Sequence, residues 1–429
     1  MKGLIFTYLM AYGGSVVALF NPFVGLLIYI CFAIIKPEFL WYWAVPPGNY
    51  SRIIAIALLI GWASHGFGRW QFGKGRMILL MFVGFFVWII PSTLASAHPA
   101  MGWSFLESSG KIFLPFLVGM TLLDSDAKLK QLAWVMMLSV GYIAFEMNLS
   151  YYSGFNRMQI MGFARMDNNS VAIEMVCGVG LALFLALGAE KWWQKALALV
   201  AALLMVHSIL FSFSRGGMLA LVISGGVGFY LMPKQPKHYL VFALIVLLGL
   251  RLAGSQVTDR FMLTFADDKE RDSSAQSRID LWGDCWEVML HNPLLGIGPD
   301  HWPLIAHEFG WKKGKEAHTL WLQIGAEMGF IGLLFLILFY GVCIRRLWPF
   351  ARSKIGDFDP WHQNVARMVI ASLVGFAVAA QFVSLERLEI PYYVTLLGAG
   401  ALRLLSEQDV SRDKILGTMP TEELNIFRK

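Results

Sequence analysis

Three short motifs in the second half of the chain carry side chains suited to anionic ligands and to proton transfer. The first is Ser-Arg-Gly-Gly at 214–217, which separates two apolar runs. Arginine presents a planar fork of donors that matches phosphate oxygens, and serine and glycine let the backbone amides of a following helix approach an anion. Arg215 is therefore a candidate anion ligand, with Ser214 in support. A capping or snorkelling role is the alternative interpretation.

The second motif pairs another cation with an aromatic face. It reads Ser-Arg-Ile-Asp-Leu-Trp at 277–282, and His-Asn-Pro-Leu-Leu-Gly-Ile-Gly follows at 291–298. The apolar positions between 277 and 289 recur with helical spacing, and Asn-Pro ends the pattern. Arg278 could hold a second part of an anionic ligand, while Trp282 suits a membrane interface or the face of a sugar ring. An amphipathic helix at the membrane surface, without a ligand, is the alternative.

The third motif is a histidine at the mouth of a long apolar run. His318 lies in Ala-His-Thr at 317–319, and the run that follows contains a small-residue stripe at Gly325 and Gly329, which another helix or a lipid tail can approach closely. Histidine is the side chain best suited to take a proton from a hydroxyl near neutral pH. Because His318 shares its region with the candidate anion ligands, it is the candidate general base. His301 is a supporting candidate, although an interfacial histidine is often structural.

Two carboxylates occur inside apolar runs, where a charge is costly unless it is paired or faces a polar cavity. Glu174 follows the Asp-Asn-Asn turn at 167–169, and Glu327 follows His318. We expect Asn169 and Glu174 to support the site. The connections assigned below to the outer face contain no Asp-x-Asp motif and no His and Glu residues at metal-ligand spacing. The predicted site therefore uses neither a metal nor another cofactor.

The composition identifies the bilayer as the solvent of the chain. Of the 429 residues, 57% are hydrophobic and 15% are charged, which is too apolar for an average soluble domain. Apolar runs of about 15 to 25 residues fit helices that cross a hydrocarbon core roughly 30 Å thick. The sequence predicts an all-α polytopic membrane protein of about 12 transmembrane helices, with residues 4–36 forming either two spans or a broken hairpin. The net charge of +6 fits contact with anionic membrane lipids, and nucleic acid is not expected as a partner.

Basic connections between the apolar runs predict the orientation. Lys and Arg gather at 69–76, 128–130, 191–195, 234–237, 345–354 and in the tail, and all of these fall on one side, which is expected to be the cytoplasm. The outer connections are then 37–51, 96–109, 149–169, 214–215, 254–318 and 385–389. The predicted organisation is a transmembrane bundle at 1–253, a small helical periplasmic subdomain at 254–318, transmembrane helices at 319–405 and a cytoplasmic tail at 406–429.

The outer connections carry more cations than this orientation rule allows. These cations are Arg157, Arg165, Arg215, Arg251, Arg260, Arg271, Arg278, Lys269, Lys312, Lys313 and Lys315. A lipid-linked phosphate or diphosphate is the natural anionic partner near a membrane surface. For any single arginine, an ion pair with a neighbouring carboxylate is the alternative.

The order of the motifs resembles the O-antigen ligase and polymerase superfamily over roughly residues 160–345: Ser-Arg-Gly-Gly, then Arg-x-x-x-Trp, then Asn-Pro-x-x-Gly-x-Gly, then Ala-His and a Gly-x-x-x-Gly-x-x-Gly helix. The resemblance implies a membrane enzyme that moves a glycan from undecaprenyl diphosphate to an acceptor hydroxyl on the periplasmic face of the bacterial inner membrane, with inversion and without a metal. It also implies that Arg215 and Arg278 bind the donor diphosphate and that His318 activates the acceptor. Thr319 stands where family ligases often have Asn, which leaves the acceptor open.

A second likeness bears on the acceptor. Asn-Pro-Phe-Val-Gly at 21–25 and the turn at 167–169 look similar to a subgroup associated with exosortase systems and assigned to protein O-glycosylation. The predicted acceptor is a hydroxyl of the lipopolysaccharide lipid A-core; a growing glycan, as in a polymerase, or a protein are the alternatives. A flippase or transporter of lipid-linked sugars is the alternative of a different class. Such proteins place charges through the depth of the bundle and often carry inverted repeats, whereas here the cations collect on one face and no repeat is visible.

Overall fold

A computed structural model of the protein describes residues 1–232, 273–353, 358–385 and 387–418, with the single positions 234, 236, 239, 240, 243 and 247; for 273–275 and 409–418 it describes the backbone only. Every named element in this part of the chain is a helix, and Phe163 and Met166 form an isolated bridge. The predicted all-α class is confirmed.

The elements alternate between long helices and short turns. In chain order they are α1 (Lys2–Tyr8), the π-helical turn η1 (Leu9–Gly13), α2 (Gly14–Phe20), α3 (Pro22–Ile35), α4 (Pro37–Leu40), α5 (Tyr50–Ser64), the 3-10 turn η2 (Gly73–Gly75), α6 (Arg76–Ala95), α7 (Pro99–Leu122), α8 (Asp126–Tyr152), α9 (Arg157–Ile160), α10 (Asn168–Gly188), α11 (Trp192–Phe211), α12 (Arg215–Leu231), α15 (Ser273–His291), α16 (Trp302–Ile305), the 3-10 turn η4 (Ala306–Phe309), α17 (Leu320–Arg352), α18 (Pro360–Ala379) and α19 (Glu389–Thr418).

Eight helical segments of the described residues are long and apolar enough to cross a membrane. They are the continuous α1–η1–α2 helix, α3 with α4, η2 with α6, and α7, α8, α10, α11 and α17; α5 and α12 are shorter apolar helices. The chain is therefore a multi-pass membrane protein. The total of about 12 spans stays a prediction, because the run at 238–253 falls outside the described residues apart from single positions.

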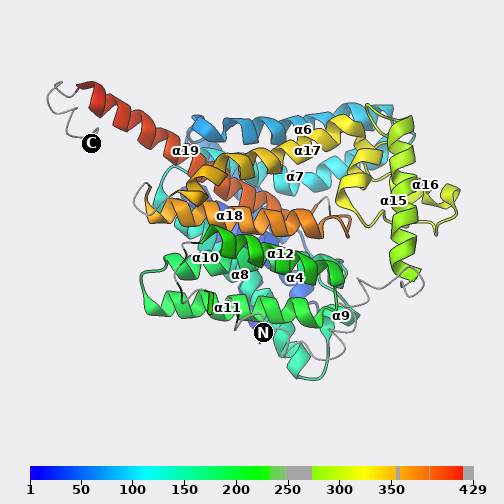
Figure 1. Ribbon diagram of the computed structural model, residues 1–429, viewed down its shortest axis with the longest axis horizontal. Helices are drawn as coiled ribbons and strands as arrows, with labels where there is room; N and C mark the ends of the chain where they lie inside the picture. Colours follow the sequence, from blue (N-terminus) through cyan, green and yellow to red (C-terminus); the bar gives the residue numbers. More distant parts are fainter. Residues whose placement is uncertain are drawn as a thin grey trace.

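α10, α12 and α17 run alongside α18 (Figure 1). α18 packs against α10, α12, α17 and α19, and its side chains at Val365, Met368 and Val369 are completely buried. The side chains along α18 are thus covered largely by protein rather than by lipid.

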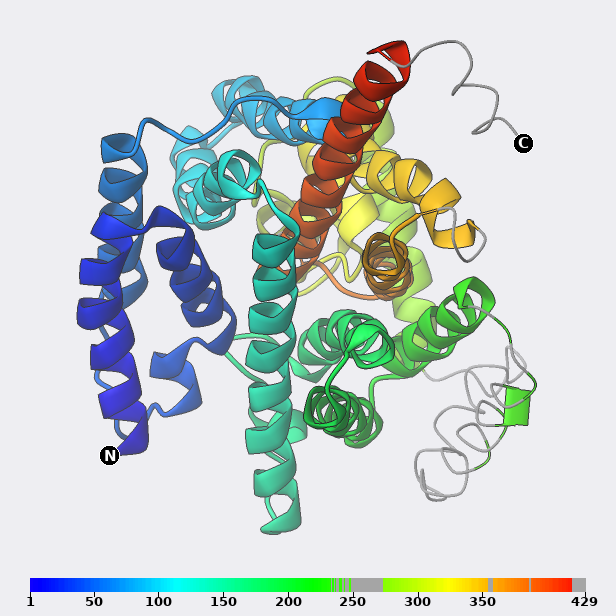
Figure 2. The ribbon, with the colours of Figure 1, turned by 90° about the vertical axis from the view of Figure 1, so that its left-hand side faces the viewer.

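The first two predicted runs form a helical hairpin. Asn21 ends α2 and caps α3, because its side-chain oxygen accepts a hydrogen bond from the first turn of α3 at 3.2 Å. Gly25 lies directly against Ala18, so the two helices approach closely. In Figure 2 these blue helices stand beside the teal α8, which Lys2 Nζ contacts at Glu146 Oε1 over 2.6 Å. The segment is therefore two long antiparallel helices, and α1 starts at the end of the bundle where α3 finishes.

One end of the bundle gathers several basic connections. Lys74 N donates to Ser406 Oγ at 2.7 Å, and the Arg346 guanidinium donates to the carbonyl of Lys74, so the starts and ends of α6, α17 and α19 meet there. Lys128 in the first turn of α8 pairs at 2.8 Å with Asp124, which lies in the turn between α7 and α8. The later part of α19 continues past residue 406 and leaves the bundle at the same end (Figure 1). That this end faces the cytoplasm stays a prediction.

α7 begins earlier than the sequence suggested. The expected outer connection at 96–109 is helical from Pro99, at the first helical position, where the missing N–H of proline costs nothing. A Cβ at Gly102 would lie 2.3 Å from Thr93 Oγ1 of α6. α7 therefore packs on α6 from its first turn, and the polar residues that suggested a loop lie on a helix.

α17 is broken near its start. Gly329 has φ 69° and ψ −177°, which interrupts the helical hydrogen-bond ladder. An unpaired backbone group is expensive within a membrane, and segment 293–298 supplies most of the missing partners. Ile297 N donates to the carbonyl of Ala326 at 3.0 Å, and Gly298 N donates to that of Glu327 at 2.9 Å. Phe330 N donates to the carbonyl of Pro293 at 2.8 Å. The remaining carbonyl, that of Met328, accepts from Trp88 Nε1 of α6 at 3.0 Å.

Glycines make this close approach possible. A Cβ at Gly296 would lie 2.3 Å from the Glu327 carbonyl carbon, and one at Gly329 would lie 2.2 Å from the carbonyl oxygen of Leu294. Met289 of α15 covers Gly325 in the same way. The small-residue stripe of α17 is thus approached by segment 293–298 and by α15.

α15 lies across one end of the other helices and nearly perpendicular to them (Figure 1). It ends at His291, directly before the predicted Asn-Pro stop. A small core of its own joins α15 to α16, η4 and the start of α17; it consists of Leu281, Cys285, Val288, Trp302, Ala306, Ala317 and Ala326. Residues 254–272 of the predicted subdomain lie outside the described residues, and the periplasmic side of the unit remains a prediction.

We expect Gly329→Ala to lower the melting temperature of the purified protein, because the new Cβ would meet Leu294 O at a φ that alanine rarely adopts. The expected cost is roughly 1–3 kcal/mol. The matched control is Gly341→Ala in the same helix, where nothing lies within 4 Å of the added Cβ; it should be neutral or stabilising by about 1 kcal/mol. Equal melting temperatures for the two variants would contradict the break as described.

Candidate active site

Arg215 is the first residue of α12, at the end of the bundle opposite the basic connections. The hydroxyl of Ser214 is the N-cap of this helix and accepts a hydrogen bond from Gly217 N at 3.1 Å. A Cβ at Gly216 would lie 3.0 Å from Phe382, and one at Gly217 would lie 2.8 Å from a side chain of α10. Capping and close packing therefore account for the serine and the glycines of the motif.

The Asp-Asn-Asn turn lies against the turn that carries Arg215. Asp167 caps α10 by accepting from Ser170 N at 2.8 Å, and Asn169 Nδ2 donates to the same carboxylate at 3.0 Å. Asn168 Nδ2 donates to the carbonyl of Ser212 at 2.7 Å. Burial raises the pKa of Asp167, but the hydrogen bonds from Ser170 and Asn169 outweigh it and the net shift is downward. Asp167 is thus held as a carboxylate.

His318 stands immediately before α17 with its backbone in the left-handed region, at φ 52°. Lys315 Nζ lies 3.1 Å from His318 Nε2; because an ammonium has no lone pair, Lys315 donates and Nε2 accepts. Partial burial, followed by the charges of Lys315 and Arg278, lowers the pKa of His318 to about 4, and Asp167 opposes this shift. The structure therefore brings His318, Arg278 and the turn at 167–169 together.

The turn after α18 links the two halves of the site. Leu320 N donates to the carbonyl of Ala380 at 2.9 Å, which fixes the backbone next to His318. Phe382 in the same turn lies against the helix start that carries Arg215, and its ring centroid is 6.4 Å from that of Trp282 on α15. The buried indole N–H of Trp282 has no acceptor among the described residues.

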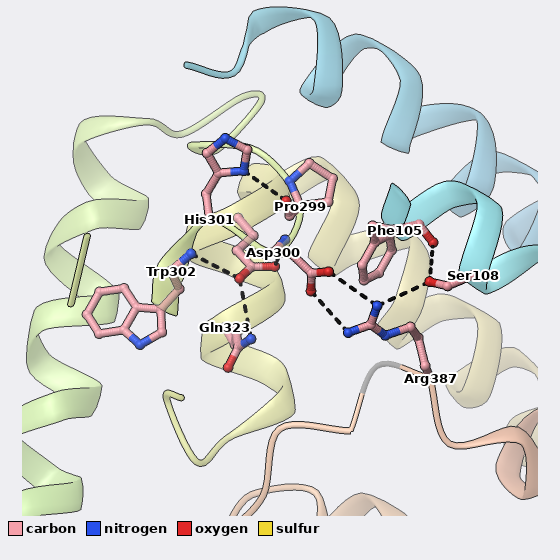
Figure 3. Close-up of polar contacts among 9 residues, drawn as sticks. Phe105, Ser108, Pro299, Asp300, His301, Trp302, Gln323 and Arg387 are labelled. Atoms are coloured by element: carbon pink, nitrogen blue, oxygen red, sulfur yellow. Dashed lines mark hydrogen bonds and ion pairs between the residues drawn. The ribbon is translucent and has the colours of Figure 1, made fainter. Parts of the chain in front are cut away.

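A further arginine, which was not among the predicted site residues, also lies here. Arg387, just before α19, pairs with Asp300 over 3.2 Å, donates to Ser108 Oγ at 3.1 Å and lies 5.1 Å over the ring of Phe105 (Figure 3). Burial raises the pKa of Asp300, and Arg387 opposes this shift. The sequence could have identified Arg387, because it lies in the short connection at 385–389 that was predicted to be outside, like the other unexpected cations.

Carboxylates complete the surroundings of His318. Partial burial, and then the neighbouring Asp167, raises the pKa of Glu316. His318 is influenced by cations from its own loop and from α15 and by the Asp167 carboxylate at the start of α10.

Glu327 holds the loop that carries Asp300. Its carboxylate is completely buried in the broken part of α17. It accepts hydrogen bonds from Asp300 N at 2.9 Å, Trp302 N at 3.1 Å and Gln323 Nε2 at 3.3 Å (Figure 3). The backbone amides of Asp300 and Trp302 thus stabilise the buried negative charge that was predicted to be costly, and these hydrogen bonds fix the position of the loop that carries them.

His301 is 2% exposed and uses both ring nitrogens within the fold. Nδ1 lies 2.8 Å from the carbonyl of Pro299, and Nε2 accepts from His98 N at 3.1 Å. A backbone N–H only donates, so Nε2 is unprotonated and Nδ1 carries the hydrogen. His301 thus joins the loop at 298–301 to the start of α7.

Glu174 is buried about two turns into α10 from Asp167. Its charge is opposed by that of Lys36, which itself pairs with Glu389 at 3.0 Å. The second oxygen of Glu174 has no hydrogen-bond partner among the described residues. Glu174 thus belongs to a buried charge cluster formed by α10, the end of α3 and the start of α19.

Some of the outer cations are satisfied inside the fold. Arg157 donates to the carbonyls of Phe39 at 2.7 Å and Leu40 at 2.9 Å, at the C-terminal end of α4. Arg165 lies 5.8 Å over the ring of Phe39. Arg251, Arg260, Arg271 and Lys269 lie outside the described residues.

Backbone strain is concentrated at this end of the molecule. Among the described residues other than glycine, positive φ occurs at Lys36, Ala164, Arg165, Phe213, Asp300 and His318, all at this end, and at Phe67 near the opposite one. Strained residues persist where the surroundings over-determine them, and they cluster at functional sites. This distribution of strained residues supports a functional site at this end of the bundle.

The family comparison agrees with the geometry. Residues 200–337 match the family model described as O-antigen ligase, and this range contains Arg215, Arg278 and His318. Residues 200–337 thus carry an O-antigen ligase domain, which supports membership of the O-antigen ligase superfamily. Residues 1–175 match a second model, described as a family of unknown function, and no curated protein matches the chain. Membership of the superfamily suggests a glycan-transferring, glycosyltransferase-like membrane enzyme with a lipid-linked glycan and an acceptor as substrates.

A separate groove of about 510 Å³ lies between α1, α3 and α8. Its lining is almost entirely apolar and includes Phe6, Leu27, Ile28 and Leu138. None of the candidate site residues lines it, so the groove plays no part in the site described above.

We expect Glu327→Gln to loosen the loop at 296–305, because the amide nitrogen of glutamine cannot accept from a backbone N–H. Losing one charge-assisted hydrogen bond should cost roughly 1.5–3 kcal/mol. Hydrogen exchange measured by mass spectrometry should become faster in this loop, with Glu287→Gln on the exposed face of α15 as the control. Unchanged exchange in the loop would show that Glu327 does not hold it.

Proposed function

We propose that the protein transfers a glycan from an undecaprenyl diphosphate carrier to a hydroxyl of the lipopolysaccharide lipid A-core. The reaction proceeds at the periplasmic face of the bacterial inner membrane, with inversion and without a metal. The resemblance in motif order supports the donor and the direction of transfer, and membership of the superfamily supports the reaction class.

The observation that carries the proposal is the environment of His318. Its imidazole is in contact with Lys315 and under the influence of Arg278 on one side and Asp167 on the other. A glycan leaving with a diphosphate needs cations to stabilise the developing charge, and an acceptor hydroxyl needs a base. Both requirements are met within one small region at the end of the bundle.

In the proposed reaction the donor diphosphate lies against Arg215 and Arg278. His318 Nε2 takes the proton of the acceptor hydroxyl while the hydroxyl oxygen attacks the anomeric carbon. The bond between that carbon and the phosphate oxygen breaks, and its electron pair leaves with undecaprenyl diphosphate. Attack from the face opposite the leaving group inverts the anomeric centre. Asp167 stabilises the imidazolium that forms.

The supporting residues act through position. Ser214 fixes the start of the helix that presents Arg215, and Asn169 holds the Asp167 carboxylate in its capping position. The indole N–H of Trp282 provides a donor for an oxygen of the diphosphate or the sugar.

We expect His318→Ala, Arg215→Ala and Arg278→Ala each to reduce glycan transfer by about 100-fold or more, the range typical of a lost base or a lost electrostatic donor. Transfer from an undecaprenyl diphosphate-linked glycan is measured in lipid nanodiscs with lipid A-core, a glycan or a protein as acceptor. Arg345→Ala, an exposed cation at the opposite end of the bundle, is the control and should retain full transfer. Full transfer by His318→Ala would remove the proposed base, and carrier movement without transfer would favour a flippase.

We expect chelation to leave transfer unchanged, because arginines supply the positive charge that a metal would otherwise supply. Initial rates are measured before and after treatment with EDTA, and again after addition of Mg²⁺. A loss of transfer that Mg²⁺ restores would contradict the metal-free mechanism.

A further inference from the structure

The contact between Lys315 and His318 occupies the nitrogen that the proposed reaction uses. Nε2 accepts from the Lys315 ammonium at 3.1 Å, so its lone pair points at Lys315. A neutral imidazole has one such lone pair, and the other nitrogen, Nδ1, then carries the hydrogen. An acceptor hydroxyl cannot pass its proton to His318 while this contact persists.

Lys315 is well suited to leave this contact. It lies in the short connection between η4 and α17, directly after Gly314, where φ is 82° and nothing lies within 4 Å of an added Cβ. Its side chain is a flexible four-carbon stem that can carry the ammonium to a new partner without a change in the backbone. A hydrogen bond from the ammonium to a neutral imidazole is also weaker than one to an anion.

We propose, on the basis of the transfer function proposed above, that Lys315 caps the base nitrogen of His318 while the site is empty. The donor diphosphate then draws the ammonium away and leaves Nε2 to the acceptor hydroxyl. Lys315 is thus a positioning residue that makes activation of the acceptor depend on the presence of the donor.

The charges around His318 give this exchange a second effect. The groups that face it are Lys315 from its own loop, Arg278 from α15 and Asp167 from α10, with Glu316 next to Lys315. A diphosphate bound to the two cations would cancel their influence, so the pKa of His318 would rise from about 4 toward the usual range of histidine. A base is most effective when its pKa is near the working pH.

The test uses the full-length protein in nanodiscs and the reagent diethyl pyrocarbonate, which modifies unprotonated imidazole nitrogens. Modification of His318 is quantified by peptide mass spectrometry near neutral pH, with and without inorganic pyrophosphate as the probe. Lys315→Met should raise the rate at His318 by about tenfold or more, the factor expected when a hydrogen bond to a charged group is lost. Pyrophosphate should raise the rate in the wild type and have no such effect in Lys315→Met.

Lys313→Met is the matched control, since Lys313 is an exposed cation in the same loop; its His318 should react like that of the wild type. Equal rates in the wild type and in Lys315→Met would overturn the cap, as would pyrophosphate slowing the reaction in both. Unmasking by pyrophosphate in a protein that transfers no glycan would reject the proposed function and leave the cap supported.

The pH dependence of transfer gives an independent readout. The acid limb of kcat/KM reports His318 in the free protein, and Lys315 is one cause of its low pKa. In Lys315→Met the limb should therefore move to higher pH, while the donor KM rises and kcat changes less. If the acid limb of kcat/KM in Lys315→Met stayed at the pH of the wild type, the proposed capping of His318 by Lys315 would be overturned, even if transfer were weaker.

Discussion

The position of the loop at 298–302 depends on the buried carboxylate of Glu327. The break in α17 leaves backbone groups that a membrane interior cannot satisfy, so segment 293–298 must dock there and supply partners. Glu327 extends this docking by accepting the amides of Asp300 and Trp302. Trp302 anchors the small core under α15, and Asp300 pairs with Arg387. An ionisable residue inside a membrane helix is by default a functional candidate; in this structure Glu327 holds the loop at 298–302 in place.

Much of the candidate site is assembled from helix ends, although Arg278 and Trp282 lie within α15. Ser214 and Asp167 are N-caps, and His318 precedes the N-cap of α17. Phe213 and His318 are both in the left-handed region, directly before these helix starts. Such turns are strained and are held by long-range contacts, such as that of Leu320 with Ala380. Rigid helices thereby hold short turns in one place, where cations and carboxylates can surround a single imidazole.

The sequence predicted what depends on local pattern. Hydropathy predicted the all-α class, and the Asn-Pro turn predicted the end of α15. The order and spacing of the motifs predicted the resemblance to the O-antigen ligase superfamily. The early start of α7 at Pro99 could not be predicted, because it depends on how Gly102 packs against α6. The partners of Lys36 and Arg387 were also out of reach, since Glu389 and Asp300 are distant in sequence. The glycines of α17 were identified as a close-approach surface, but which segment approaches is decided by the backbone groups that the break exposes.

The excess of outer cations now separates into groups with different consequences. Arg157 is held by helix-end carbonyls and Arg387 by a carboxylate, and each would have to give up a good partner before it could bind a ligand. Lys315 donates to a neutral imidazole. A hydrogen bond between two charged groups is stronger than one in which only one partner is charged, which favours Arg387 keeping its partner. Arg157 makes two carbonyl hydrogen bonds where Lys315 makes one to the imidazole, so a diphosphate that enters this region would take Lys315 more readily than either arginine. Of these three cations, Lys315 is thus the one that an anionic substrate can move most readily, and its present partner is the candidate base itself.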